Sequence, residues 1–141
     1  MSKPFFSLLC CAALGVAGIA AISMAAEPPA ANAAAAPPIT QDALLERLER
    51  KDPDLVVLDV RTPAEFAAGH VPGARNVSHD VLSSKLAELG ELRDKQVVLY
   101  CRSGRRTLLA EDALRKAGFT KLLHLQGDYL AWEAEHRPIQ K

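Results

Sequence analysis

Beyond residue 38, apolar residues gather in short runs that predict strands. Residues 55–60 form an apolar run interrupted only by Asp59, as expected for a strand buried on both faces of a parallel sheet. Residues 96–100 and 121–125 are predicted as further strands, and a shorter strand is expected near residues 74–77. These runs are separated by longer segments with a different periodicity.

The intervening segments carry apolar residues at helical spacing. Helices are predicted after the cap residue Thr40, from Thr62 to Gly69, from Asp80 to Gly90, over residues 107–118 and over residues 127–133. Strands that alternate with helices indicate an α/β domain with a parallel sheet and helices on both faces. In such sheets, ligands bind beyond the carboxyl ends of the strands.

Residues 1–26 have the pattern of a secretory signal peptide. Lys3 supplies a positive start, no charged residue occurs from Pro4 to Ala26, and small residues at positions 23–25 match a cleavage site. The apolar run is long for a signal peptide, so an uncleaved membrane anchor is the alternative. With either outcome, the rest of the chain is expected to be exported.

Residues 27–38 are rich in alanine and proline and are predicted to form a disordered linker. A single domain is then expected over residues 39–141, which is long enough for one compact core. The chain carries 17 basic and 17 acidic residues, so no overall charge favours nucleic acid. We therefore expect no binding to nucleic acid. A monomer is also expected, with membrane contact only if the leader stays attached.

Cys101 is the only cysteine that remains once the leader is removed. Exported proteins usually pair their cysteines in disulfides, so a single one indicates a free reactive thiol. A buried core cysteine is the alternative, but the sequence Arg-Ser-Gly-Arg-Arg that follows is not core sequence. A redox thiol is another alternative, although the domain holds no second cysteine to resolve a disulfide.

Cys101 stands where a predicted strand ends, and Arg102, Arg105 and Arg106 follow within five positions. The next element is a helix, and the N–H groups and dipole at a helix N-terminus favour an anion. Positively charged surroundings also favour the thiolate form of a cysteine. The stretch therefore predicts a nucleophile that meets an anionic substrate.

The chain resembles the rhodanese-like sulfurtransferases in three stretches. These are residues 58–66 continued by residues 69–76, the loop at residues 100–106, and Gln126-Gly127 with Trp132. One departure is Asp128, which stands where the family usually has a second glycine. The resemblance covers residues 39 to about 138 and implies a parallel sheet of about five strands flanked by helices. An export signal before one such domain is similar to small periplasmic rhodaneses, which implies a periplasmic location, or the inner membrane if the leader is uncleaved.

The resemblance implies that Cys101 is the catalytic nucleophile of a thiosulfate sulfurtransferase. Its thiolate attacks the outer sulfur of thiosulfate or a related donor, and the resulting persulfide passes that sulfur to cyanide or a thiol. The residues expected to bind substrate are Arg102, Ser103, Gly104, Arg105 and Arg106. Arg102 and Arg106 are the better candidates for direct contact, and Arg105 is the candidate to reach a neighbouring acid. No cofactor or metal is implied.

A rhodanese-fold phosphatase or arsenate reductase is the nearest alternative. The loop of those relatives is one residue longer, with arginine six positions after the cysteine, where this chain has Thr107. The shorter loop here gives a cup suited to one sulfur atom and too small for a tetrahedral phosphate. A non-catalytic module that carries sulfur or docks a partner protein is the other alternative, but such family members usually lack the cysteine.

Other polar residues are assigned structural roles. Asp59 and Arg61 are interpreted as an ion pair that fixes loops, His70 as a structural hydrogen-bonding group and Trp132 as core packing. His79, His124 and His136 show no partner pattern. Because the histidines and the cysteine lack metal-ligand spacing, no metal site is predicted.

Overall fold

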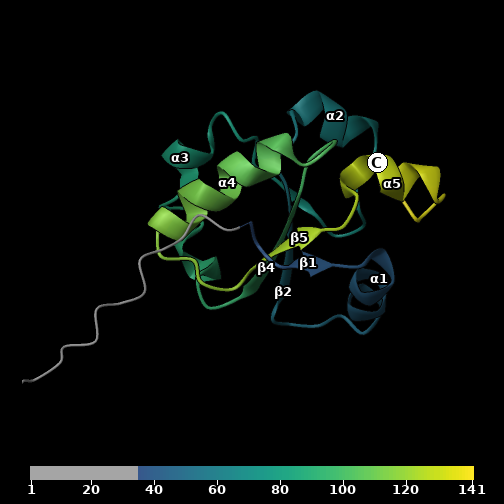
Figure 1. Cartoon of the computed structure of the whole chain (residues 1–141), viewed down its shortest axis with the longest axis horizontal. Coiled ribbons are helices and arrows are strands. Elements are labelled where there is room, and N and C mark those ends of the chain that lie inside the picture. Colours follow the sequence, from purple (N-terminus) through teal and green to yellow (C-terminus); the bar gives the residue numbers. More distant parts are fainter. Residues whose placement is uncertain (1–34) are drawn as a thin grey trace, which may run out of the picture. The chain divides into compact units, whose positions relative to one another are not determined.

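The computed structural model describes residues 35–141, which form a five-stranded parallel sheet with helices on both faces (Figure 1). The strands are β1 (Pro38–Ile39), β2 (Leu55–Asp59), β3 (Arg75–Asn76), β4 (Gln96–Tyr100) and β5 (Leu122–Leu125). The helices are α1 (Gln41–Glu49), α2 (Pro63–Ala68), α3 (Leu82–Lys85), α4 (Arg105–Lys116) and α5 (Asp128–Ala134), with a 3₁₀ turn at Gly90–Leu92. The predicted α/β fold is confirmed, and the strand order β1-β5-β4-β2-β3 places β4 at the centre.

Alternate residues of the central strand enter two separate cores. Val97 and Leu99 join the core beneath α3 and α4, whereas Val98 and Tyr100 join the core shared with α1 and α5. Figure 1 shows α3 and α4 on one side of the sheet and α1 on the other. Because both faces of β4 are covered, residues 97–100 have no solvent side, which explains why all four are apolar or aromatic.

Two helices begin as their cap residues predict. The Thr40 hydroxyl oxygen accepts the Ala43 N–H at the start of α1, at 3.2 Å. At the start of α2, Thr62 and Glu65 form a reciprocal capping box, in which each side chain accepts the other residue's backbone N–H. The capping box fixes Glu65 close to the carboxyl end of β2, where it becomes part of the site described below.

The third predicted helix is shorter than its sequence pattern indicates. Asp80 does not cap it, because the Asp80 carboxylate accepts the Ser78 hydroxyl instead. The helix begins at Leu82 and ends at Lys85, and the 3₁₀ turn at Gly90–Leu92 replaces its expected end. Leu82, Leu89 and Leu92 are nevertheless buried. The apolar pattern therefore predicted the buried positions correctly, but the prediction of one continuous helix was wrong.

The folded part begins before residue 39. Pro38 pairs with β5 as part of β1, and the Pro37 carbonyl accepts the His124 N–H at 3.0 Å. Ala36 is buried and donates its N–H to Glu111 of α4, at 2.7 Å. The last residues of the predicted linker are therefore held by the domain, whereas the predicted signal peptide and residues 27–34 lie outside the described part of the chain.

Two of the structural assignments made from the sequence are confirmed. Trp132 is fully buried and donates its indole N–H to the Pro138 carbonyl at 2.8 Å. The His70 ring stacks on Phe66, with 3.6 Å between ring centroids, and its Nδ1 lies 2.9 Å from the Phe66 carbonyl oxygen. Both side chains hold segments of the backbone in place and have a structural role.

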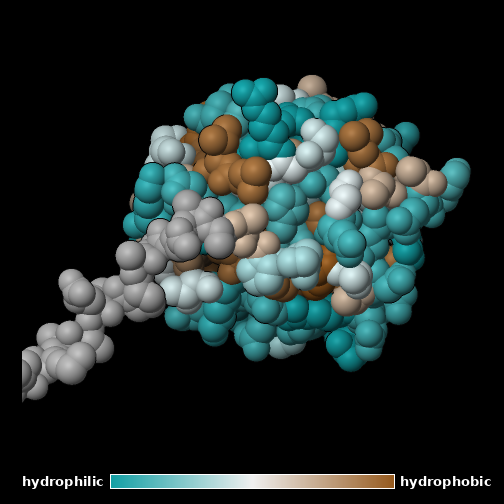
Figure 2. Space-filling model, in the orientation of Figure 1, coloured by the Kyte–Doolittle hydropathy of each residue, from teal (hydrophilic) through white to brown (hydrophobic). Residues whose placement is uncertain are grey.

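The surface in Figure 2 is largely hydrophilic and is interrupted by separate apolar patches. The large apolar side chains exposed in the described region are Val81, Leu108, Leu109, Leu130 and Ile139. Within residues 35–141, no helix has the length and apolar character needed to cross a membrane.

Candidate active site

Cys101 follows β4 directly, at the carboxyl edge of the sheet. The loop turns through Gly104, whose φ of +94° lies in the left-handed region that favours glycine. Helix α4 begins at Arg105, two residues earlier than predicted. The Gly104 N–H donates to the Cys101 sulfur at 3.1 Å, so the loop curls back over the thiol and presents an N–H donor to it.

The start of α5 holds this loop from the other side. The Cys101 and Arg102 carbonyls accept the N–H groups of Tyr129 and Leu130, at 3.0 and 3.1 Å. The Cys101 N–H in turn donates to the Asp128 carboxylate at 2.8 Å. These three bonds tie the backbone of Cys101 and Arg102 to the start of α5, while the Gly104 N–H donates to the sulfur.

The three arginines of the loop have different surroundings. Arg106 forms a two-pronged ion pair with Glu65 of α2, at 2.7 and 2.9 Å. The hydrogen bond to Glu65 raises the pKa of Arg106, and the same bond lowers the pKa of Glu65 from 4.5 to about 2. Among residues 35–141, Arg105 forms no ion pair. The arginine that reaches a neighbouring acid is therefore Arg106, and the assignment of that role to Arg105 was wrong.

A pocket of about 360 Å³ opens over the thiol. Its lining residues are His79, Cys101, Ser103, Arg105, Arg106 and Leu109. Arg102 is exposed and does not line this pocket, and Gly104 contributes from beneath through its N–H. Cys101 is only 1% exposed and belongs to the core beneath α3 and α4, but its sulfur also accepts an N–H and borders a pocket lined by two guanidinium side chains.

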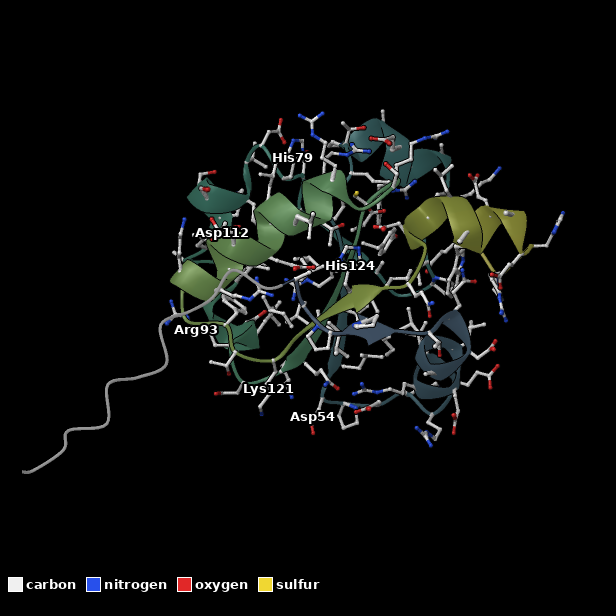
Figure 3. The ribbon with its side chains drawn as sticks, viewed as in Figure 1. Asp54, His79, Arg93, Asp112, Lys121 and His124 are labelled. Atoms are coloured by element: carbon white, nitrogen blue, oxygen red, sulfur yellow. The ribbon has the colours of Figure 1, made fainter. Side chains whose placement is uncertain are left out.

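His79 was not predicted as a site residue. It lies in the loop before α3, beside α4 (Figure 3), and its Nδ1 is buried without a hydrogen-bond partner in the described part of the chain. The sequence offers no local signal for this placement, because His79 reaches the pocket only through the packing of its loop against α4.

A second group of polar side chains lies under the loop. His124 of β5 sits between two carboxylates, with Nε2 at 3.0 Å from Asp128 and Nδ1 at 2.9 Å from Glu111 of α4. The Glu111 contact is an ion pair by distance and does not meet hydrogen-bond geometry. Hydrogen bonding to Asp128, followed by the Glu111 contact, raises the pKa of His124 to about 10. The ring is therefore protonated at neutral pH.

The ion pair between Asp59 and Arg61 lies at the end of the neighbouring strand β2. It is buried, with side-chain exposures of 0% and 4%, and its closest contact is 2.6 Å. Arg61 also donates to the Gly69 carbonyl at 2.7 Å and lies 3.8 Å from the centre of the Tyr129 ring. The predicted structural role is thus supported by direct contacts, but the pair is a buried one rather than the exposed pair assumed from the sequence.

Glu65→Gln is expected to lower the free energy of unfolding by about 1 kcal/mol at pH 7, because glutamine keeps the cap but loses the charge that pairs with Arg106. The folded pKa of Glu65 lies below its unfolded value, so the charged pair stabilises the fold above about pH 4.5. That contribution is lost as the pH falls toward about 2.

Urea unfolding of the wild type and the variant at pH 7 and pH 3 measures this effect. The difference between the two proteins should be smaller at pH 3. An equal difference at both pH values would show that the substitution acts through packing rather than through the charge.

In the part of the chain that the structure describes, no cluster of histidine, cysteine, aspartate and glutamate side chains has the geometry to hold a metal ion. The groups assembled at the site are the Cys101 thiol, the Gly104 N–H, two guanidinium groups and an imidazole ring. This set suits the binding of an anion beside a nucleophilic sulfur.

Comparison with known proteins identifies the family of the domain. The family model described as "Rhodanese-like domain" matches residues 40–135. A sulfurtransferase of Allochromatium vinosum is 35% identical over 101 residues, which cover 72% of this chain and 92% of that protein. The solved rhodanese-like domain of an Anabaena sp. protein is 29% identical, with a TM-score of 0.65 over 74% of this chain and 78% of that chain. The human single-domain sulfurtransferase is 28% identical, with a TM-score of 0.61 over 71% of this chain and 97% of that chain.

Proposed function

This chain belongs to the rhodanese-like domain family, and from that premise we propose that it transfers the outer sulfur of thiosulfate, or of a related donor, through a persulfide on Cys101 to cyanide or a thiol. Its sulfurtransferase relatives set the reaction class. One observation supports thiosulfate or a related anion as the donor. Cys101 and Arg105 line the same pocket, and Arg105 forms no ion pair within the described region.

In the first half-reaction, the Cys101 thiolate attacks the outer sulfur of thiosulfate. A bond forms between the two sulfur atoms, the sulfur–sulfur bond of thiosulfate breaks, and sulfite leaves with the bonding electron pair. The Gly104 N–H stabilises the anionic sulfur, and Arg105, with Arg106 beside it, holds the sulfonate oxygens. The product is a persulfide on Cys101.

In the second half-reaction, cyanide or a thiolate attacks the terminal sulfur of the persulfide. The sulfur–sulfur bond breaks and its electron pair returns to Cys101, which regenerates the thiolate. Cyanide leaves as thiocyanate, and a thiol acceptor leaves as its own persulfide. Because sulfite departs before the acceptor reacts, ping-pong kinetics follow.

The length of the loop favours sulfur over phosphate as the transferred group. Gly104 is already within 3.1 Å of the Cys101 sulfur, and α4 begins at the next residue. Because the helix starts so early, few loop residues remain to widen the cup around a tetrahedral group.

Treatment of the purified full chain with thiosulfate is expected to add one sulfur atom to Cys101, and cyanide should remove it as thiocyanate. Mass spectrometry of the intact chain and of its peptides checks the gain and its position, since Cys10 and Cys11 are also in the sequence. An aryl phosphate serves as the competing substrate. Turnover of the phosphate alone, or no sulfur on the peptide that contains Cys101, would overturn the proposal.

The periplasm is the proposed location of this reaction, because residues 1–26 have the pattern of an export signal. If the leader is not cleaved, it anchors the domain to the inner membrane on the periplasmic side. N-terminal sequencing of the protein recovered from the periplasmic and membrane fractions distinguishes these two outcomes, and recovery from the cytoplasm alone would contradict both.

A further inference from the structure

Asp128 closes the base of the active-site loop. One carboxylate oxygen, Oδ1, accepts the Cys101 N–H at 2.8 Å and the Thr107 hydroxyl at 3.2 Å. Cys101 begins the loop and Thr107 lies in the first turn of α4, so a single oxygen joins both ends of the loop. Asp128 is 5% exposed and has a left-handed φ of +52°, a conformation that aspartate tolerates better than most residues.

A buried carboxylate so close to the sulfur has an electrostatic cost, because it repels the thiolate. His124 offsets this cost. Its Nε2 lies 3.0 Å from the second oxygen of Asp128. Burial alone would raise the pKa of Asp128, but the hydrogen bonds from His124 and from the Cys101 N–H outweigh burial and lower this pKa. The carboxylate and the protonated ring thus form a pair without net charge.

The pair lies directly below Gly104. A Cβ atom placed on Gly104 would be 3.1 Å from Asp128 Oδ2 and 3.7 Å from His124 Nε2. The N–H of the same glycine donates to the Cys101 sulfur. The imidazolium is therefore separated from the nucleophile by the backbone of one residue, and Figure 3 shows His124 near α4 and β5.

We propose that Asp128 and His124 are positioning residues for the Cys101 nucleophile. The Asp128 carboxylate clamps the two ends of the loop, and the His124 imidazolium cancels the repulsion between that carboxylate and the anionic sulfur. The inference rests on the proposed function only in that Cys101 is the nucleophile.

Other titratable or charged groups face the Cys101 sulfur and His124. Around the sulfur these are Arg105 and Arg106 of α4, with Glu65 of α2 behind Arg106, and His79 from the loop before α3. Around His124 they are Glu111 and, 3.4 Å from Glu111, Arg115. Removal of His124 leaves all of them in place and exposes the thiolate to the uncompensated charge of Asp128.

The test is the rate at which iodoacetamide alkylates Cys101 as a function of pH, measured on the full chain with Cys10→Ser and Cys11→Ser. In His124→Gln, the pH midpoint of alkylation should rise by about one unit. In Asp128→Asn, which keeps an oxygen for the Cys101 N–H, the midpoint should not rise. The double variant His124→Gln with Asp128→Asn should return close to the wild-type midpoint, because both charges are then gone.

Asp128→Gly tests the clamp separately, since glycine accepts the left-handed backbone and removes only the side chain. Its alkylation midpoint should not rise, whereas kcat for sulfur transfer should fall about tenfold with little change in KM. His136→Asn is the matched control, because His136 is an exposed histidine outside the cluster.

An unchanged midpoint in His124→Gln, or a double variant whose midpoint stays as high as that of His124→Gln, would overturn the inference. If His124→Gln does not fold, a midpoint in Asp128→Asn above the wild-type value overturns it equally. Alkylation needs no sulfur donor. Failure of thiosulfate transfer would therefore contradict the proposed function alone, and failure of the midpoint shift would contradict this inference alone.

Discussion

Cys101→Ser is expected to lower kcat/KM for thiosulfate at least about a thousandfold, because a serine hydroxyl is not ionised at neutral pH and forms no persulfide. The fold should be unaffected. Serine is slightly smaller than cysteine, and its oxygen accepts the Gly104 N–H that the sulfur now accepts. Steady-state turnover with thiosulfate and cyanide measures the loss.

Circular dichroism and urea unfolding of the same variant show whether the loss is chemical or structural. A folded variant with no turnover and no sulfur gain after thiosulfate treatment supports transfer through Cys101. Turnover above about one hundredth of the wild-type rate would show that another group carries the sulfur.

Arg61→Met is expected to lower the free energy of unfolding by about 3–5 kcal/mol, the largest stability effect predicted for this chain. The substitution leaves the Asp59 carboxylate, which is 0% exposed, without the guanidinium that pairs with it at 2.6 Å. It also removes the donor to the Gly69 carbonyl and the cation that lies over the Tyr129 ring. Urea unfolding at pH 7 measures the change.

Two further variants separate the buried charge from general packing. The double variant Asp59→Asn with Arg61→Met should be more stable than Arg61→Met alone, because no unpaired charge remains in the core. Arg75→Met is the matched control, since Arg75 and Glu91 form an exposed pair at 3.4 Å and should contribute less than about 1 kcal/mol. A loss in Arg61→Met no larger than in Arg75→Met would contradict the prediction.

Local chemistry was enough to predict most of the elements. Thr40 and the Thr62–Glu65 box mark helix starts through bonds that span three residues, so their signals lie in adjacent sequence. There are two exceptions. No apolar run predicted β1, which pairs with β5. In α3, Ser78 engages Asp80 and removes the expected cap. The nearby Ser78 hydroxyl thus prevents Asp80 from acting as the helix cap, and the spacing of apolar residues in this segment gives no sign of that bond.

The partners of the site residues depend on strand order. The sheet places β2 beside β4, so α2, which follows β2, brings Glu65 to Arg106 across 41 residues of sequence. The same sheet places β5 on the other side of β4, which brings His124 and Asp128 beneath the loop. Arg105 and Arg106 are adjacent in the sequence, so their distances from Cys101 along the chain did not show which of them would pair with an acid.

Neighbouring residues were enough to show that Cys101 ends a buried strand, that three arginines follow it and that a helix comes next, because strand, loop and helix signals are local. The tertiary structure decided which arginine lines the pocket without an ion pair in the described region, and which carboxylate holds the loop. It also decided that Asp59 and Arg61 are buried. These properties arise from contacts between distant segments that the order of strands in the sheet brings together. The same order sets how deeply the side chains are buried, and burial in turn shifts the pKa values of ionisable groups.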